Sequence, residues 1–140
     1  MFQLHPQLAE DCILLGDFPL TRVLLNKDAN YPWFILVPKR EEIREIYQLS
    51  EADQQQLLWE SSYFSRQIHD LFQADKLNVA ALGNMVPQLH VHHIVRYKKD
   101  VAWPAPVWGH VAALEYDAGR LDEVCEGVRD ILLEQFKPLY

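Results

Sequence analysis

In QLHVHHIVR, residues 88–96, three histidines fall within four positions: His90, His92 and His93. The alternation of polar and apolar residues in this stretch is typical of a β-strand, where side chains point to the two faces in turn. One face then carries Gln88, His90, His92, Ile94 and Arg96. The other face is mostly apolar and carries Leu89, Val91, His93 and Val95. His90 and His92 are therefore expected to project together, and His93 to point the opposite way.

Three explanations of these histidines are open. A packed core residue suits His93, on the apolar face, but two imidazoles on one polar face would each need partners. Zinc takes three or four ligands from His, Cys or carboxylates, and no third ligand follows His90 and His92 at a typical spacing. A neutral imidazole that attacks phosphorus is the third explanation. It needs a neighbour that orients it and donors for the phosphoryl oxygens, and Gln88 and His92 flank His90 at two-residue steps.

The residues before this stretch predict further strands. Short apolar runs at 11–18 and 21–28 are separated by Pro19 and predict a hairpin, and residues 31–40 predict a third strand. Residues 77–84 predict a strand with Gly83 and Asn84 as its turn, followed by the histidine strand over 88–97. Strands and helices that do not alternate strictly indicate an α+β fold with an antiparallel sheet.

Helices are predicted between and after the strands. Ser50 is a good N-cap for a helix of about 22 residues, with Glu51 and Asp53 in its first turn. Its buried stripe would consist of Leu57, Ser61, Phe64, Ile68 and Leu71. A shorter helix is expected over 41–49. A last helix is expected over 120–136, with an apolar face of Leu121, Val124, Val128, Ile131, Leu132 and Phe136. The segment 103–109, with two prolines and two tryptophans, reads as an ordered loop.

Composition narrows the class of protein. The 140 residues are 49% hydrophobic, enough for the core of a single domain. A net charge of −7 disfavours long nucleic acid as a partner but leaves small phosphorylated ligands open. No apolar run reaches the roughly 18 residues of a membrane span, and no signal-peptide pattern is visible, so we expect a cytoplasmic protein without membrane contact. Cys12 and Cys125 are expected to be reduced, apolar residues.

The sequence resembles the histidine triad (HIT) family, whose signature is His-φ-His-φ-His-φ-φ on a strand, where φ is apolar. LLNKDANYPWFILVPKR is similar to the family's ribose-binding segment, and LNVAALGNMVPQLHVHHIVR to its strand, polar loop and triad strand. The resemblance covers about residues 10–100. It implies a HIT-like fold: a five- to six-stranded antiparallel meander packed by one long and one or two shorter helices. We expect a single HIT-like domain over 1–140, with a loop and helix at 101–140 after the core.

Two registers of the triad are open. Positions 88, 90 and 92 put Gln88 in the first place, whereas positions 90, 92 and 94 put Ile94 in the last. We prefer the first register, because His92, His93 and Ile94 then match the family's His-φ-φ ending. The resemblance makes His90 the nucleophile and His92 a contact to the phosphate or leaving group. Gln88 then stands where a supporting histidine is usual, and it could orient His90 but carry no proton charge.

The resemblance also assigns substrate-binding positions. Asn26 matches the ribose-binding residue, with a plain turn residue as the alternative reading. Asn84 lies where the family places a polar contact to phosphate, and its alternative is a simple Gly-Asn turn. Arg96, on the face of the two histidines, is a third candidate for substrate binding. Trp33 departs from the family, in which many members have a His there. Trp108 and Trp103 would pack, close over a base or support a partner.

The expected function is a nucleotide hydrolase or nucleotidyl transferase, of the phosphoramidate or dinucleoside polyphosphate type, that forms a nucleotidyl-histidine on His90. No cofactor and no metal are expected, and a homodimer is expected by analogy. One rival is a binding or regulatory module in which Gln88 has removed turnover; Gln88→His would restore activity to such a protein. The other rival is a small metal-binding protein that uses the three histidines, which metal analysis would reveal.

Overall fold

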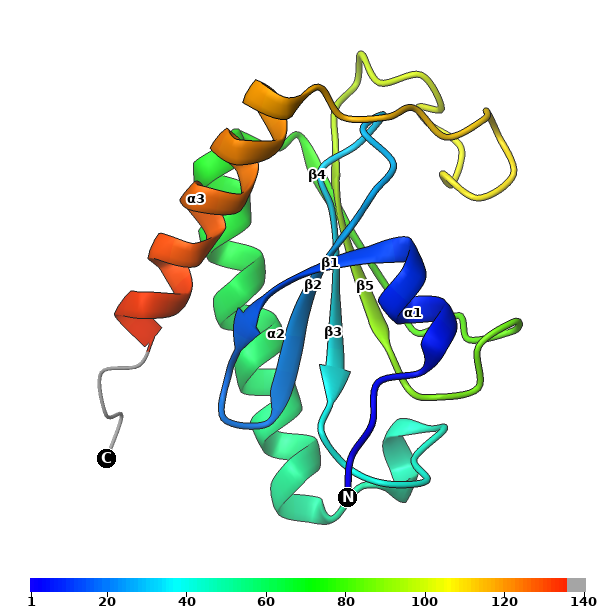
Figure 1. Cartoon of the computed structure of the whole chain (residues 1–140), viewed down its shortest axis with the longest axis vertical. Helices are drawn as coiled ribbons and strands as arrows, with labels where there is room; N and C mark the ends of the chain where they lie inside the picture. Colours follow the sequence, from blue (N-terminus) through cyan, green and yellow to red (C-terminus); the bar gives the residue numbers. More distant parts are fainter. Residues whose placement is uncertain (136–140) are drawn as a thin grey trace.

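The computed structural model describes residues 1–135, and its five strands form one antiparallel sheet (Figure 1). The strands are β1 (Cys12–Asp17), β2 (Thr21–Asn26), β3 (Trp33–Pro38), β4 (Lys76–Ala80) and β5 (Val91–Arg96). Their order across the sheet is β1-β2-β3-β5-β4. The α+β fold and the antiparallel sheet predicted from the sequence are confirmed.

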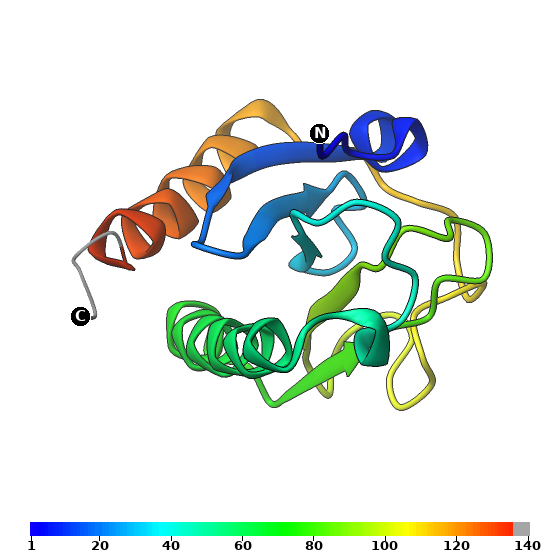
Figure 2. The same cartoon turned by 90° about the horizontal axis from the view of Figure 1, so that it is seen from below.

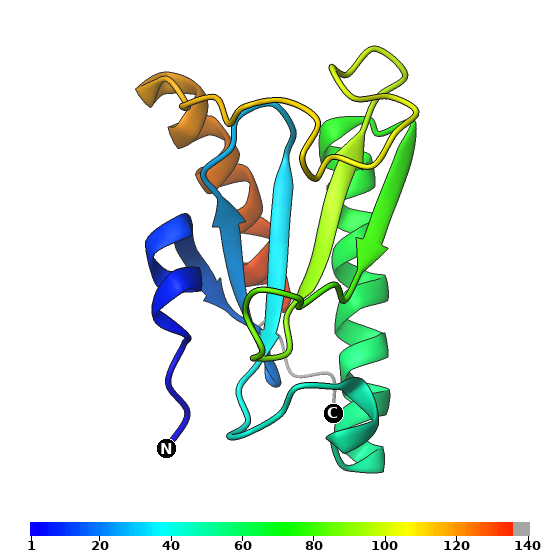
Figure 3. The ribbon, with the colours of Figure 1, turned by 90° about the vertical axis from the view of Figure 1, so that its right-hand side faces the viewer.

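The two long helices cover one face of the sheet, and the other face is covered by a short helix and a long loop. Helices α2 (Glu51–Phe72) and α3 (Ala118–Gln135) pack on the first face, where Phe34, Phe64 and Val128 lie in one apolar core. Helix α1 (Pro6–Asp11) and residues of the loop after β5 pack on the second face against Ile35 and Ile94. Figure 2 shows this division, and Figure 3 shows the strands between α1 and α2.

Helix α2 has the length and the N-cap predicted for it. Ser50 Oγ accepts the Asp53 backbone N–H at 3.1 Å, which satisfies one free donor of the first turn. Leu57, Phe64 and Ile68 are buried as predicted, but the side chain of Leu71 is 45% exposed. The sequence pattern also missed a buried carboxylate on this helix. Glu60 accepts the backbone N–H groups of Leu20 and Thr21, each at 2.9 Å, and so anchors α2 to the start of β2.

The structure differs from the sequence-based expectations in the start of the histidine strand, in the segment 41–49 and in a helix near the N-terminus. The strand predicted over 88–97 begins only at Val91, because Gln88 and His90 make local and N-terminal contacts in place of strand pairing. The helix predicted over 41–49 is reduced to a 3₁₀ turn, Ile46–Gln48. Helix α1 was not predicted; His5 caps it by accepting the Gln7 N–H at Nδ1, and Pro6 opens it.

In α3, Val124, Val128, Ile131 and Leu132 are buried as predicted. Phe136, which the sequence placed on the same apolar face, lies outside the described residues. Among residues 1–135, no helix is both long enough and apolar enough to cross a lipid bilayer.

Candidate functional site

His90 is held by the main chain in one tautomer. Its Nδ1 lies 2.7 Å from the carbonyl oxygen of Gln88, and this oxygen can only accept, so Nδ1 carries the proton. In the neutral ring Nε2 then keeps its lone pair. The residue is 6% exposed and borders two pockets, so a ligand can reach it although most of the ring is buried. The chemistry available at Nε2 is nucleophilic attack or proton acceptance.

His92 is locked in the opposite tautomer by Trp33. The indole N–H of Trp33 donates to His92 Nδ1 at 2.9 Å, and since an indole nitrogen is only a donor, Nδ1 must be unprotonated. The neutral ring then carries its proton on Nε2. Burial, together with the smaller effects of the nearby His90 and His93, lowers the pKa of His92 to about 3. His92 is therefore a neutral hydrogen-bond donor, with its ring centroid 4.9 Å from that of His90.

His93 lies on the opposite face of the sheet, as the alternation predicts. Its Nδ1 donates to the carbonyl oxygen of Val91 at 3.0 Å, so its Nε2 accepts the Ser61 hydroxyl at 2.7 Å. It is fully buried, and this burial lowers its pKa to about 4. His93 thus belongs to the helix-side core and does not converge with the other two histidines. Across residues 1–135, no three His, Cys, Asp or Glu side chains are grouped so as to hold a metal ion.

A pocket of about 260 Å³ brings together four of the residues predicted to form the site: Asn26, Asn84, His90 and His92. They come from β2, the β4–β5 loop and β5 and its approach. The pocket's remaining lining is mostly apolar and consists of Leu8, Asp11, Cys12, Trp33, Ile35, Leu82, Gly83, Met85, Val86 and Trp108. A largely apolar pocket with a few converging polar groups is typical of a small-molecule site.

The two asparagines have different local roles. Asn26 Oδ1 accepts the Asp28 backbone N–H at 2.9 Å, so it is a turn residue and its NH₂ group is the part left for a ligand. Asn84 is exposed and follows Gly83, whose φ of 58° lies in the left-handed region that favours glycine. Both readings offered by the sequence for Asn26, turn and ligand contact, are compatible with this geometry.

Gln88 does not touch His90 through its side chain. Its Oε1 accepts the His5 backbone N–H at 2.8 Å, and its Nε2 donates to the Gln3 carbonyl oxygen at 2.9 Å. The amide thus ties down the segment that leads into α1. The orientation of His90 that we expected from this side chain comes from the backbone carbonyl of the same residue.

Arg96 is not brought to the pocket. Its side chain is 2% exposed, and the guanidinium makes a two-pronged pair with Asp100, at 2.8 and 3.0 Å. It also donates to Asn78 Oδ1 at 2.7 Å and to the Ala105 carbonyl oxygen at 2.8 Å. Burial raises the pKa of Asp100, but the hydrogen bond and charge of Arg96 and the backbone N–H groups of Tyr97 and Trp103 together outweigh it, so the pKa is lowered. Arg96 therefore holds the loop after β5, and its predicted contact with substrate has no support in this geometry.

Several pocket residues escaped the sequence reasoning. Leu8, Asp11 and Cys12 come from α1 and the start of β1, and no motif marked them because α1 itself was not predicted. Burial raises the pKa of the Cys12 thiol to about 12, so it is an unreactive wall. Trp108 packs with its ring centroid 5.0 Å from that of His92. Two features of the sequence pointed to aromatic residues at the site. Trp33 stands where many members of the family have a His, and the segment 103–109 contains two tryptophans.

Comparisons with known proteins place the chain in a family and match its fold. The family model of the HIT domain matches residues 7–99. A histidine triad protein from Marinobacter aquaeolei VT8 is 51% identical, with a TM-score of 0.93 over 96% of this chain and 98% of that chain. One from Bradyrhizobium japonicum is 50% identical, with a TM-score of 0.91 over 92% and 96%. One from Sinorhizobium meliloti 1021 is 35% identical, with a TM-score of 0.90 over 93% and 96%. A comparison with curated proteins gives no match.

Proposed function

Because the chain belongs to the HIT domain family, we propose that it is a hydrolase or transferase that acts at the α-phosphorus of a nucleotide through a nucleotidyl intermediate on His90. The observation that carries the proposal is the pair of opposite tautomers in one pocket. His90 presents a lone pair at Nε2, and His92 presents an N–H at Nε2. A nucleophile beside a neutral donor is the combination that displacement at a phosphoryl centre needs.

The reaction is written in two steps. His90 Nε2 attacks the α-phosphorus, an N–P bond forms, and the bond from phosphorus to the leaving group breaks with its electron pair going to that group. When the leaving group is ammonia, its nitrogen also takes a proton from solvent as the bond breaks. Water or another acceptor then attacks the same phosphorus, its proton passes to solvent, and the N–P electron pair returns to Nε2. The scheme as written uses no metal ion or cofactor.

The neighbouring residues have supporting roles in this scheme. His92 donates from Nε2 to a phosphoryl or leaving-group oxygen, and it stays neutral because its pKa is about 3. The NH₂ group of Asn26 binds a ribose hydroxyl, and Asn84 contacts the phosphate. A cleft of about 520 Å³ shares Asp11 and Asn26 with the pocket and offers room for the rest of the nucleoside.

Gln88 is compatible with turnover in this scheme. A glutamine cannot carry a proton, but the group that fixes the tautomer of His90 is the backbone carbonyl, which every residue type supplies. The side-chain amide is already used by the N-terminal segment. This geometry favours an enzyme over a binding module disabled by the change at position 88.

The proposal is tested by release of AMP from adenosine 5′-phosphoramidate. We expect turnover in the wild type and a loss of at least about 10³-fold in His90→Ala, since the nucleophile is removed. His92→Ala should retain more activity than His90→Ala. Turnover that persists in His90→Ala, with the fold intact by circular dichroism, would reject His90 as the nucleophile.

A homodimer is the second part of the proposal. Strand β4 is an edge of the sheet, and its Val79 is 50% exposed beside Leu58 of α2, which is 69% exposed. These residues line a mostly apolar groove of about 550 Å³. Pairing β4 with β4 of a second copy would continue the antiparallel sheet and cover this surface. Light scattering after gel filtration should give a dimer for the wild type and a monomer for Val79→Lys; a monomeric wild type would contradict it.

A further inference from the structure

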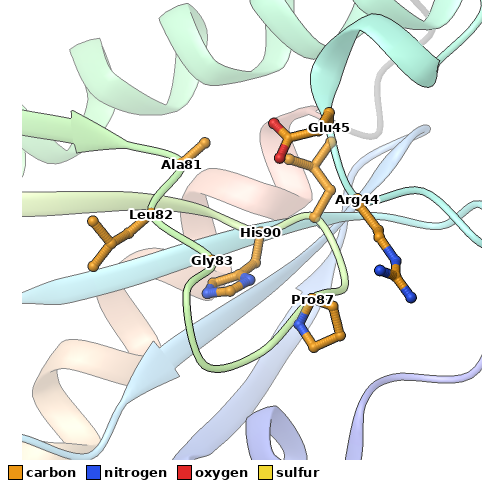
Figure 4. Close-up of a pocket in the computed structure, with 8 residues that line it drawn as sticks. Arg44, Glu45, Ala81, Leu82, Gly83, Pro87 and His90 are labelled. Carbon is orange, nitrogen blue, oxygen red and sulfur yellow. The ribbon is translucent and has the colours of Figure 1, made fainter.

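A second pocket, of about 200 Å³, lies on the other flank of His90 and has no role in the scheme above (Figure 4). It is formed by the segment after β3, the β4–β5 loop and the approach to β5, and is lined by Arg44, Glu45, Ala81, Leu82, Gly83, Pro87, Leu89 and His90. Leu82, Gly83 and His90 also line the nucleotide pocket. A phosphorus atom bonded to His90 would therefore lie where the two pockets meet.

Arg44 brings an uncommitted positive charge to this second pocket. Its backbone N–H donates to Gln48 Oε1 at 2.8 Å, which fixes the chain at this point. Within residues 1–135 its guanidinium has no ion pair, whereas Arg40 nearby is paired with Asp53 at 2.7 Å. Figure 4 shows the Arg44 guanidinium and the His90 imidazole on either side of the chain that carries Pro87, and all three residues line the pocket. A guanidinium without an ion pair at the edge of a pocket can donate two hydrogen bonds to a phosphate or carboxylate group.

Glu45 lines the same pocket but is oriented differently. Its side chain accepts a backbone N–H in a capping box with Gln48, so the carboxylate is held by the 3₁₀ turn. Figure 4 shows this carboxylate directed away from the Arg44 guanidinium. Its negative charge still weakens the attraction of the pocket for anions. Removing the charge of Glu45 should therefore have the opposite effect to removing the charge of Arg44.

We propose that this second pocket receives the leaving group, and that Arg44 favours leaving groups that carry negative charge, such as a nucleoside diphosphate, over ammonia. The inference rests on nucleotidyl transfer by His90 as proposed above. When the N–P bond forms, the P–O bond to the leaving phosphate breaks, and the oxygen departs with the electron pair as an anion. A guanidinium beside that anion stabilises it as its charge develops.

The test compares two substrates that give the same adenylyl intermediate. Diadenosine triphosphate releases the ADP anion, and adenosine 5′-phosphoramidate releases ammonia. In Arg44→Gln, the ratio of kcat/KM for the triphosphate to that for the phosphoramidate should fall about tenfold. In Glu45→Gln the ratio should rise. Arg66→Gln, which removes an exposed arginine of α2, should leave it unchanged. An unchanged ratio in Arg44→Gln, or an equal fall in Arg66→Gln, would overturn the assignment.

A binding measurement separates failure of this inference from failure of the proposed function. Titration calorimetry on the His90→Ala protein compares diadenosine triphosphate with AMP, with no turnover to interfere. Adding Arg44→Gln should weaken the triphosphate relative to AMP about tenfold. If the wild type turns over neither substrate but this difference appears, the pocket assignment stands without the chemistry. If the two affinities change equally, Arg44 does not select the leaving group.

Discussion

The indole N–H of Trp33 on β3 donates to Nδ1 of His92 on β5 at 2.9 Å. Because Nδ1 accepts this hydrogen bond, the proton of the neutral His92 ring is on Nε2. Protonation of His92 Nδ1 would place its N–H opposite the indole N–H of Trp33, so that two donors would face each other without an acceptor. Burial, with the nearby His90 and His93, lowers the pKa of His92 to about 3 and so keeps the ring neutral. The tautomer of His92 is thus fixed by the indole of Trp33.

Trp33→Phe removes this donor and leaves most of the packing. Without it His92 can take either tautomer, so we expect kcat to fall about tenfold with a smaller change in KM. Trp33→His, which restores an N–H donor, should recover part of the loss. The control is Trp59→Phe, on α2 and stacked on Tyr63 away from the pocket. Unchanged kcat in Trp33→Phe would show that the tautomer lock has no catalytic role.

The sequence allowed the sheet and the faces of the histidine strand to be predicted because both follow from a two-residue alternation. His92 and His93 point to opposite faces for that reason alone. It did not allow all the contacts of Gln88 and Arg96 to be predicted, since their partners include Gln3 and Ala105. The backbone positions of these two residues depend on how the N-terminal segment and the loop after β5 fold back. The shared pocket of Asn26 and His90 was expected from the family resemblance rather than from the strand pattern.

The stability of the fold should fall as the pH is lowered below about 6.5. In the folded chain the pKa of His93 is lowered from 6.5 to about 4, so the unfolded chain binds its proton first and acid favours unfolding. The contribution of His93 is complete above pH 6.5 and is lost progressively towards pH 4. Between pH 7 and pH 5 it amounts to about 2 kcal/mol. His92 adds a similar effect.

Urea unfolding at pH 7 and pH 5 measures this dependence. The loss of unfolding free energy should be smaller by about 2 kcal/mol in His93→Gln than in the wild type, although the variant is less stable at pH 7. Equal losses in both proteins would show that His93 is not held neutral by the fold.

Gln88→Ala should loosen the N-terminal segment. The two amide hydrogen bonds to Gln3 and His5 are lost, and α1, which supplies Leu8 and Asp11 to the pocket, becomes less firmly held. We expect faster amide hydrogen exchange over residues 3–11 and a rise in KM that exceeds any fall in kcat. Gln67→Ala on α2 is the control. A large fall in kcat with unchanged exchange would instead indicate that the Gln88 side chain acts on His90.

Arg96→Met should destabilise the protein by about 3–5 kcal/mol, because Asp100 is left as a buried, unpaired charge. Urea unfolding measures the loss, and Arg66→Met, at an exposed position, should stay within about 0.5 kcal/mol of the wild type. If the variant keeps its stability but loses affinity for AMP, Arg96 contacts the substrate, as expected from the sequence.

The central claim, that His90 carries the nucleotidyl group, is tested most directly by trapping the intermediate. Wild-type protein is mixed with a phosphoramidate substrate labelled in the α-phosphate, quenched in alkali, digested and analysed by mass spectrometry. We expect an acid-labile label on His90, and none in His90→Ala. A label on His92 or on another residue, or turnover in the wild type with no covalent label at any reaction time, would contradict it.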